Sequence, residues 1–189
     1  MAHSDDEAWS ASPDRRRGDG ARADAIDRLQ RQWIRERPDI DVSSVGITSR
    51  VWRTARMLTR IRDAQLRRLG TDAVTVDVLA ELRRAGPPYR MTAGQLREVS
   101  SISAGGVSQR LDRLERADLI ERSISGGDRR VINVRLTEKG RALIDSVLAE
   151  LMANESAMLE DLSPSEHRRL EDLLRRVMEI VEKAEHRTK

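Results

Sequence analysis

The sequence predicts a mainly α-helical fold with one small β-hairpin. Charged residues make up 35% of the 189 residues and aromatic residues only 2%, which suits long solvated helices better than a β-sandwich or barrel. Apolar residues recur at three- and four-residue steps along most of the chain, the period of an amphipathic helix. Two strand-like segments surround a pair of glycines between residues 119 and 136, as expected for a single hairpin.

The first 22 residues are expected to form a disordered tail. They mix charges of both signs with glycine and contain almost no apolar side chains, so burial cannot order them. Trp9 stands alone in this tail. It is either a docking anchor or, more simply, a solvated side chain.

Two helices are expected after the tail. The first covers residues 23–37, and Pro38 blocks its continuation. The second runs from about 44 to 69, and Gly70 is a plausible terminator. Their apolar stripes are Ile26, Leu29 and Trp33 in the first helix and Val51, Ala55, Leu58, Ile61 and Leu69 in the second. Trp52 is expected to belong to the buried stripe of the second helix.

A third and a fourth helix should follow with a sharp turn between them. The third covers roughly Val74 to Arg84, and the glycine and paired prolines of residues 85–88 end it. Thr92 begins the fourth helix, and Gln95 three residues later lets hydroxyl and amide cap each other's backbone donors. This helix should end near Ser100.

The next segments complete a winged helix-turn-helix. Ser103 is a natural N-cap for a helix that ends near Arg116. Its inner face carries Val107, Leu111 and Leu114. Residues 119–123 and 131–136 are strand-like in composition, and Gly126-Gly127-Asp128 between them has the chemistry of a hairpin turn. A hairpin directly behind two short helices joined by a tight turn is a wing.

Two long helices are expected at the C-terminus. Thr137 caps one that ends near Leu159, and Ser163, Pro164 and Glu166 form the start of the other. Its apolar face comprises Leu170, Leu173, Leu174, Val177, Met178 and Val181. The terminal helices of so small a domain cannot bury both stripes internally, which predicts a homodimer formed by the N- and C-terminal helices. The alternative is a monomer whose last helix folds back on its own wing.

The distribution of charge favours double-stranded DNA as a partner. The net charge is only +3, but arginines crowd into residues 83–135, beside the helix-turn-helix pattern. The second helix of this motif enters the major groove. Its candidate DNA-binding residues are Ser103, Ser108, Gln109, Arg110 and Arg113. Gln109 can bind adenine, whereas Arg113 can reach either guanine or a phosphate, and the sequence leaves both open.

The hairpin tip supplies further candidates. Asp128, Arg129 and Arg130 place two guanidinium groups where one can enter the minor groove, with Asp128 holding it in position. The alternative is a solvated, charged turn. Gly105 and Gly106 in the preceding helix either allow close approach to phosphates or are simply tolerated in a first turn.

Residues 128–130, followed by Val134-Arg135-Leu136-Thr137-Glu138-Lys139-Gly140, resemble the wing signature of the MarR family. Residues 111–115 before 119–122 resemble its recognition helix leading into the wing, and the likeness covers about 74 to 181. The resemblance implies a dimeric regulator, usually a repressor of a palindromic operator, that small anionic or phenolic ligands release. It implies that Arg130 is the minor-groove arginine, so Arg130→Ala is expected to weaken operator binding by roughly 1–3 kcal/mol.

The helix that carries Trp33 is similar to one in the urate-responsive HucR/PecS branch of that family. Asp77, Arg84 and Arg110 also match that branch, and Asp77 and Arg84 lie two turns apart on one helix face. The resemblance implies that urate is attracted by Arg84, contacts Trp33 and repels Asp77, while Arg110 transmits the change. Aconitate or citrate are alternative anions. Otherwise Trp33 is a core anchor, Asp77 and Arg84 form surface ion pairs, and Arg110 contacts phosphate.

Other classes find little support in the sequence. There is no cysteine, and no phosphate loop, nucleophile elbow or metal-binding helix motif, so neither catalytic nor metal-binding residues nor a cofactor are expected. No apolar run nears the roughly 18 residues that span a bilayer, so a cytoplasmic, nucleoid-associated protein without a membrane partner is expected. The rival interpretation is a sequence-tolerant architectural DNA-binding protein without an effector.

These expectations divide the chain into four segments. Residues 1–22 form the tail, and residues 23–70 form N-terminal helices for dimerisation and the ligand pocket. Residues 71–136 form the winged helix-turn-helix domain, and residues 137–189 form the C-terminal dimerisation helices.

Overall fold

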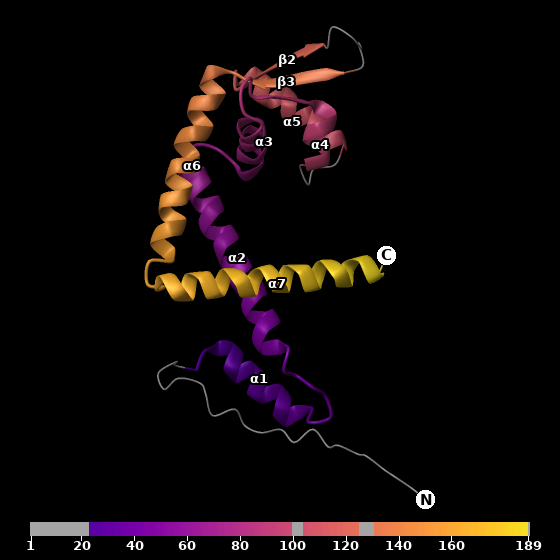
Figure 1. Cartoon of the computed structure of the whole chain (residues 1–189), viewed down its shortest axis with the longest axis vertical. Helices are drawn as coiled ribbons and strands as arrows, with labels where there is room; N and C mark the ends of the chain where they lie inside the picture. The colour runs from indigo at the N-terminus through magenta and orange to yellow at the C-terminus, as the bar shows by residue number, and fades with distance from the viewer. Residues whose placement is uncertain (1–22, 100–103, 125–130, 189) are drawn as a thin grey trace, which may run out of the picture. The chain divides into compact units, whose positions relative to one another are not determined.

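The computed structural model describes residues 23–99, 104–124 and 131–188. It consists of helices with one small antiparallel sheet, as the sequence predicts (Figure 1). The chain separates into two units, Met1–Thr59 and Arg60–Lys189. The elements in chain order are α1 (Ala25–Glu36), α2 (Val45–Arg68), α3 (Ala73–Arg84), β1 (Arg90–Thr92), α4 (Ala93–Val99), α5 (Ala104–Arg116), β2 (Ile120–Ile124), β3 (Ile132–Leu136), α6 (Glu138–Met158) and α7 (Pro164–Thr188).

Polar contacts at the start of α1 organise the first unit. Asp24 caps α1 by accepting hydrogen bonds from the backbone N–H groups of Ile26 and Asp27 at 2.7 and 2.9 Å. Arg50 of α2 donates to the carboxylates of both Asp24 and Asp27. The amide of Gln30 donates to the carbonyl oxygen of Val42 at 3.1 Å. These bonds tie α1 to the first half of α2.

The core of the second unit lies between α3, α6 and the sheet. Its fully buried side chains come from these elements, from α4 and from the end of α2: Leu66, Leu79, Leu82, Leu96, Ile120, Val134 and Ile144. Figure 1 shows α3, α4 and α5 gathered beside β2 and β3. Burial of this set, together with Leu111 and Leu114 of α5, provides the main force that holds the helix pair against the hairpin.

The sheet has the strand order β1-β3-β2, with antiparallel pairing throughout. β2 and β3 confirm the predicted hairpin. β1 was not predicted, because three residues are too few to display an alternating pattern. It pairs with β3, with Met91 opposite Val134. This third strand joins the helix pair to the base of the wing.

Capping contacts confirm four of the predicted helix boundaries, at Gly70, Thr92, Thr137 and Ser163. Gly70 has φ of 71°, and the N–H of Thr71 donates to the carbonyl of Leu66 at 2.9 Å, which ends α2. Thr92 and Gln95 exchange hydrogen bonds at 2.8 and 3.1 Å in a capping box. Thr137 accepts a bond from the N–H of Gly140 at 3.0 Å at the start of α6. The hydroxyl and backbone N–H of Ser163 both donate to Glu166 at the start of α7.

The prediction that Trp52 is buried is wrong for the single chain, because its exposed fraction is 67%. The stripe around it is also uncovered, since Val51, Leu58 and Ile61 are each at least 39% exposed. The helical spacing of the apolar residues was predicted correctly, but these side chains remain exposed among the residues that the structure describes. Within the described ranges, none of the helices is long and apolar enough to cross a membrane.

Candidate nucleic-acid interface

The DNA-reading helix predicted from the sequence is α5, and two buried leucines mark the face that it turns towards the core. Leu111 and Leu114 are each 3% exposed and face the core. Ser108 and Gln109 are exposed on the N-terminal half of α5, and the side chain of Arg113 is 74% exposed. Ser103 lies outside the described residues. The polar side of the helix is therefore turned away from the core, where a duplex can meet it.

A cluster of three charged residues joins α5 to β2. The guanidinium of Arg122 donates to Glu115 Oε2 through Nε at 2.9 Å and through Nη2 at 2.5 Å. Its Nη2 also lies 2.7 Å from Asp112 Oδ1. These hydrogen bonds from Arg122 hold the pKa of Glu115 below its usual range. The recognition helix and the first wing strand are thus connected by a doubly paired arginine.

The turn between α5 and β2 is held by the start of α6. The hydroxyl of Thr137 donates to the carbonyl oxygen of Asp118 at 2.7 Å. The ammonium of Lys139 donates to the carbonyl oxygen of Ala117 at 2.8 Å. Asp118 itself has φ of 59°, the left-handed conformation that closes the helix end. Residues of the wing signature therefore bind the turn behind the recognition helix.

The described part of the wing ends at the cross-strand pair Ile124 and Ile132. Both side chains are exposed, at 66% and 41%. The predicted DNA-contacting tip residues Asp128, Arg129 and Arg130 lie outside the described residues. Their roles stay predictions, although the strands that would carry them are present.

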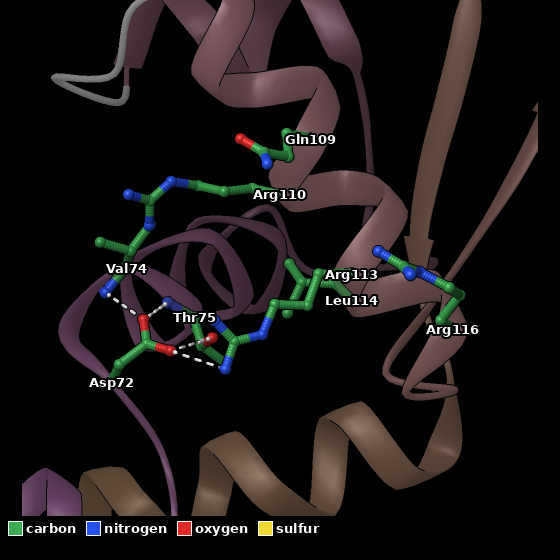
Figure 2. A pocket seen from close by; sticks show the side chains of 8 residues that line it. All are labelled: Asp72, Val74, Thr75, Gln109, Arg110, Arg113, Leu114 and Arg116. Atoms are coloured by element: carbon green, nitrogen blue, oxygen red, sulfur yellow. Dashed lines mark hydrogen bonds and ion pairs between the residues drawn. The ribbon is translucent and has the colours of Figure 1, made fainter.

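A cavity of about 410 Å³ lies between the start of α3 and one face of α5 (Figure 2). It is lined by Asp72, Val74, Thr75, Gln109, Arg110, Arg113, Leu114 and Arg116. Figure 2 shows Arg110 and Arg113 reaching from α5 towards α3. The lining contains three arginines and one carboxylate, which gives the cavity a positive balance that favours anions.

Asp72 connects this cavity to α3. Its Oδ1 caps the helix by accepting from the N–H groups of Val74 and Thr75 at 3.1 and 2.9 Å. Its Oδ2 lies 3.8 Å from Nη2 of Arg113. Burial raises the pKa of Asp72, but the hydrogen bonds from Thr75 and Val74 and the charge of Arg113 outweigh it, so the pKa lies below its usual value.

The predicted ligand-binding residues of α3 are exposed and engaged in ion pairs. Arg62 Nη2 donates to Asp77 Oδ1 at 3.1 Å. Arg84 pairs with Glu81 one turn before it. Surface ion pairs of this kind were the alternative to a ligand site, and exposed pairs contribute little to stability.

The remaining predicted ligand-binding residues lie on other elements. Arg110 is half-buried on α5 and lines the cavity together with Gln109. Asp77 and Arg84 are not among the residues that line it. Trp33 belongs to the first unit, on α1, with an exposed fraction of 47%. Its exposure differs from that of a core anchor.

Sequence reasoning missed the roles of Asp72 and Arg122. An aspartate just after the Gly70 terminator is an N-cap signal for α3 and could have been identified. The pairing of Arg122 with Glu115 gave no periodic signal, because a turn separates the two. In the part of the chain that the structure describes, no group of three or more His, Asp or Glu could hold a metal ion.

The comparison of sequences matches residues 69–131 to the MarR family. The chain is 36% identical over 149 residues to the HTH-type transcriptional regulator PecS of Dickeya dadantii, an alignment that covers 79% of this chain and 90% of PecS. It is 31% identical over 121 residues to an uncharacterised HTH-type transcriptional regulator of Bacillus cereus, covering 64% of this chain and 78% of that protein. The region that matches the family contains α3, α4 and α5.

Solved structures agree with this match. A MarR mutant from E. coli in complex with operator DNA aligns with a TM-score of 0.56 and 26% identity, over 73% of this chain and 99% of that one. AbsC, a MarR family transcriptional regulator from Streptomyces coelicolor, aligns with a TM-score of 0.60 and 25% identity, over 71% of this chain and 94% of AbsC. A similar fold therefore occurs in a protein whose structure was solved in complex with operator DNA.

Proposed function

This chain belongs to the MarR family, whose members are DNA-binding transcriptional regulators and not enzymes, and from that premise we propose a ligand-responsive repressor. It binds a palindromic operator as a homodimer and is released by a small anion such as urate. The observation that carries the proposal is the exposed polar face of α5, held beside the wing by Arg122. Regulation from within the nucleoid follows from this activity.

DNA recognition is assigned to α5 and the wing. Gln109 and Arg113 project from the exposed face of α5, at positions from which a recognition helix reaches base edges or phosphates. Arg110 adds a cation beside them. The wing tip supplies Arg129 and Arg130, which the family resemblance assigns to the minor groove. Together these groups give one protomer contacts with two grooves of one half-site.

The homodimer is supported by apolar surface that the single chain leaves uncovered. On α7, Leu170, Leu174 and Val181 are 42%, 44% and 60% exposed and fall on one helix face. The stripe of α2 around Leu58 is similarly exposed. Continuous apolar faces of this size mark association surfaces. A second copy of the chain offers the same faces and gives the twofold symmetry that a palindrome requires.

The effector proposal is supported by the match of Trp33, Asp77, Arg84 and Arg110 to the urate-responsive branch. Arg84 and Asp77 are accessible on α3 and are held only by exposed ion pairs. An anion that pairs with Arg84 competes with Glu81 and places negative charge near Asp77. Arg110 reaches from α5 towards α3 beside the cavity, so a shift of α3 is passed to the DNA-reading helix.

Titration of the complex between the protein and its upstream region with urate tests this proposal, at fixed salt and pH. Urate is expected to release the DNA, and Arg84→Ala to raise the required concentration by roughly ten-fold or more. Arg67→Ala, which removes an exposed arginine of α2, is the matched control and should keep the wild-type response. If urate fails to release the DNA at about millimolar concentration but aconitate or citrate releases it, the effector is that anion and not urate. Failure of all three would favour an effector-independent protein.

A further inference from the structure

We propose that Arg122 is a positioning residue, which locks the recognition helix α5 to wing strand β2 so that both engage DNA in one fixed geometry. The proposal rests on the function inferred above and assigns its operator specificity to a contact outside the reading face. Arg122 touches no base in this account. It acts through Asp112 and Glu115, which follow Gln109 along α5.

The geometry of the cluster suits this role. Arg122 uses three nitrogen atoms: its backbone N–H donates to Glu115 Oε1 at 3.2 Å, and Nε and Nη2 donate to Glu115 Oε2. Nη2 also contacts Asp112. A planar guanidinium paired on two sides restricts direction as well as distance, which a single point charge does not.

The hydrophobic contacts of α5 restrict its rotation and sliding only weakly, so the charged cluster can add this restriction. Leu111 and Leu114 are buried and set the distance of α5 from the core. Apolar contact is non-directional, so it resists separation more strongly than small rotation or sliding. Asp112 and Glu115 each follow one of these leucines in sequence and fix the rotation through Arg122. Arg122 in turn sits opposite Val134, which is fully buried, so its own strand is anchored.

The cluster is also placed where an error would be amplified. β2 ends at Ile124, directly before the residues predicted to form the wing tip, whereas α5 carries the side chains proposed to read bases. When α5 is bound in its groove, a small change in the angle between α5 and β2 therefore displaces the wing from its own contact with the DNA. Loss of the clamp should reduce binding to the cognate operator more than binding to unrelated DNA, which needs only phosphate contacts.

Charge neutralisation is the competing explanation for any effect of Arg122. Asp112 and Glu115 carry two negative charges and Arg122 one positive charge, so the cluster has a net charge of −1. Removal of Arg122 alone leaves −2 on the DNA-reading helix and repels every duplex. The triple variant Arg122→Gln, Asp112→Asn, Glu115→Gln lacks the clamp but carries no charge. This variant therefore distinguishes the positioning role of Arg122 from its neutralisation of Asp112 and Glu115.

The DNA experiment compares the dissociation constants for the cognate operator and an unrelated duplex of equal length, at one salt concentration. Arg122→Gln and the triple variant should both lose roughly ten-fold or more of the operator preference. Arg122→Lys, which keeps the charge but not the fork, should regain only part of it. Arg135→Gln is the matched control, because it removes an ion pair with Glu121 inside the sheet. An equal loss for both duplexes, or full recovery in the triple variant, would overturn the proposal.

A second measurement tests the clamp in the free protein. The chain has no cysteine, so Ser108→Cys in α5 and Ser123→Cys in β2 create two spin-label sites at exposed positions. The distance distribution between the labels should be narrow in the parent and in Arg135→Gln, and broad in Arg122→Gln. An equally narrow distribution in a folded Arg122→Gln protein would overturn the clamp. Absence of operator preference in the unlabelled wild-type protein would instead refute the proposed function, while the spin-label result still decides the clamp.

Discussion

The backbone of Gly140 in α6 lies directly against the carbonyl of Leu119, so that a Cβ at Gly140 would stand 1.9 Å from that oxygen. The same oxygen accepts a hydrogen bond from the N–H of Thr137 at 3.2 Å. The first turn of α6 is therefore packed backbone to backbone on the segment that follows the recognition helix. Glycine is required at position 140 of the wing signature because no room remains there for a side chain.

Gly140→Ala is expected to lower the free energy of unfolding by about 1–3 kcal/mol or more, because backbone atoms on both sides must move apart. Gly94→Ala in α4 is the matched control. Its Cβ would meet only the hydroxyl of Thr92 at 3.7 Å, so it should be neutral or stabilise by up to about 1 kcal/mol. Denaturant unfolding measures both. Equal stability of the two variants would contradict the close approach.

Asp72 combines two roles that different substitutions can separate. Asp72→Ala removes the cap of α3 and should destabilise the protein by about 1 kcal/mol, within the usual range for a lost N-cap. Asp72→Asn keeps an oxygen for the N–H groups of Val74 and Thr75 but loses the charge facing Arg113. It should retain most of the stability. The capping role fails if both variants unfold at the same denaturant concentration.

The depressed pKa of Glu115 predicts a dependence of stability on pH. Its carboxylate is favoured in the folded protein by hydrogen bonds from Arg122, so the pKa lies below the usual value of 4.5. Its stabilising contribution is therefore complete above that value and is lost as the pH falls through the lower folded pKa. Between about pH 6 and pH 3, Glu115→Gln should lose less stability than the wild-type protein. Denaturant unfolding at each pH measures this difference. An equal loss of unfolding free energy in the two proteins across this range would contradict the ion pair.

Dimerisation through α7 can be tested by placing a charge on its apolar face. Leu174→Glu should convert the dimer to a monomer, since the buried carboxylate would face apolar side chains of the partner. Glu179→Gln changes an exposed residue on the opposite face of the helix and should leave the dimer intact. Sedimentation velocity at micromolar concentration reads out both. A monomeric wild-type protein, or a dimeric Leu174→Glu protein, would contradict the assignment of this face.

The elements that the sequence predicted well are those with a local physical cause. Thr92 with Gln95, and Ser163 with Glu166, cap helices through neighbours three residues away, so the boundaries could be derived from spacing. The hairpin followed from its strand composition and central glycines. The MarR resemblance added the order of the elements, and the sequence match to PecS agrees with it.

The contacts that escaped prediction depend on tertiary structure. Arg122 meets Glu115 only because a turn reverses the chain, and Asp72 meets Arg113 across two helices. The exposure of Trp52 was also missed. An apolar stripe predicts that a helix face is buried, but it does not show whether the same chain or a second copy buries it. The short strand β1 exists because it pairs with β3, and its own sequence carries no strand pattern.

The most direct test of this account is competition for the labelled upstream region between its own unlabelled operator and an unrelated duplex of equal length, at one salt concentration. A regulator that reads bases through α5 and the wing should require roughly a thousand-fold more of the unrelated duplex for displacement. Displacement by both duplexes at the same concentration would contradict the account and assign the protein to sequence-tolerant, architectural DNA binding.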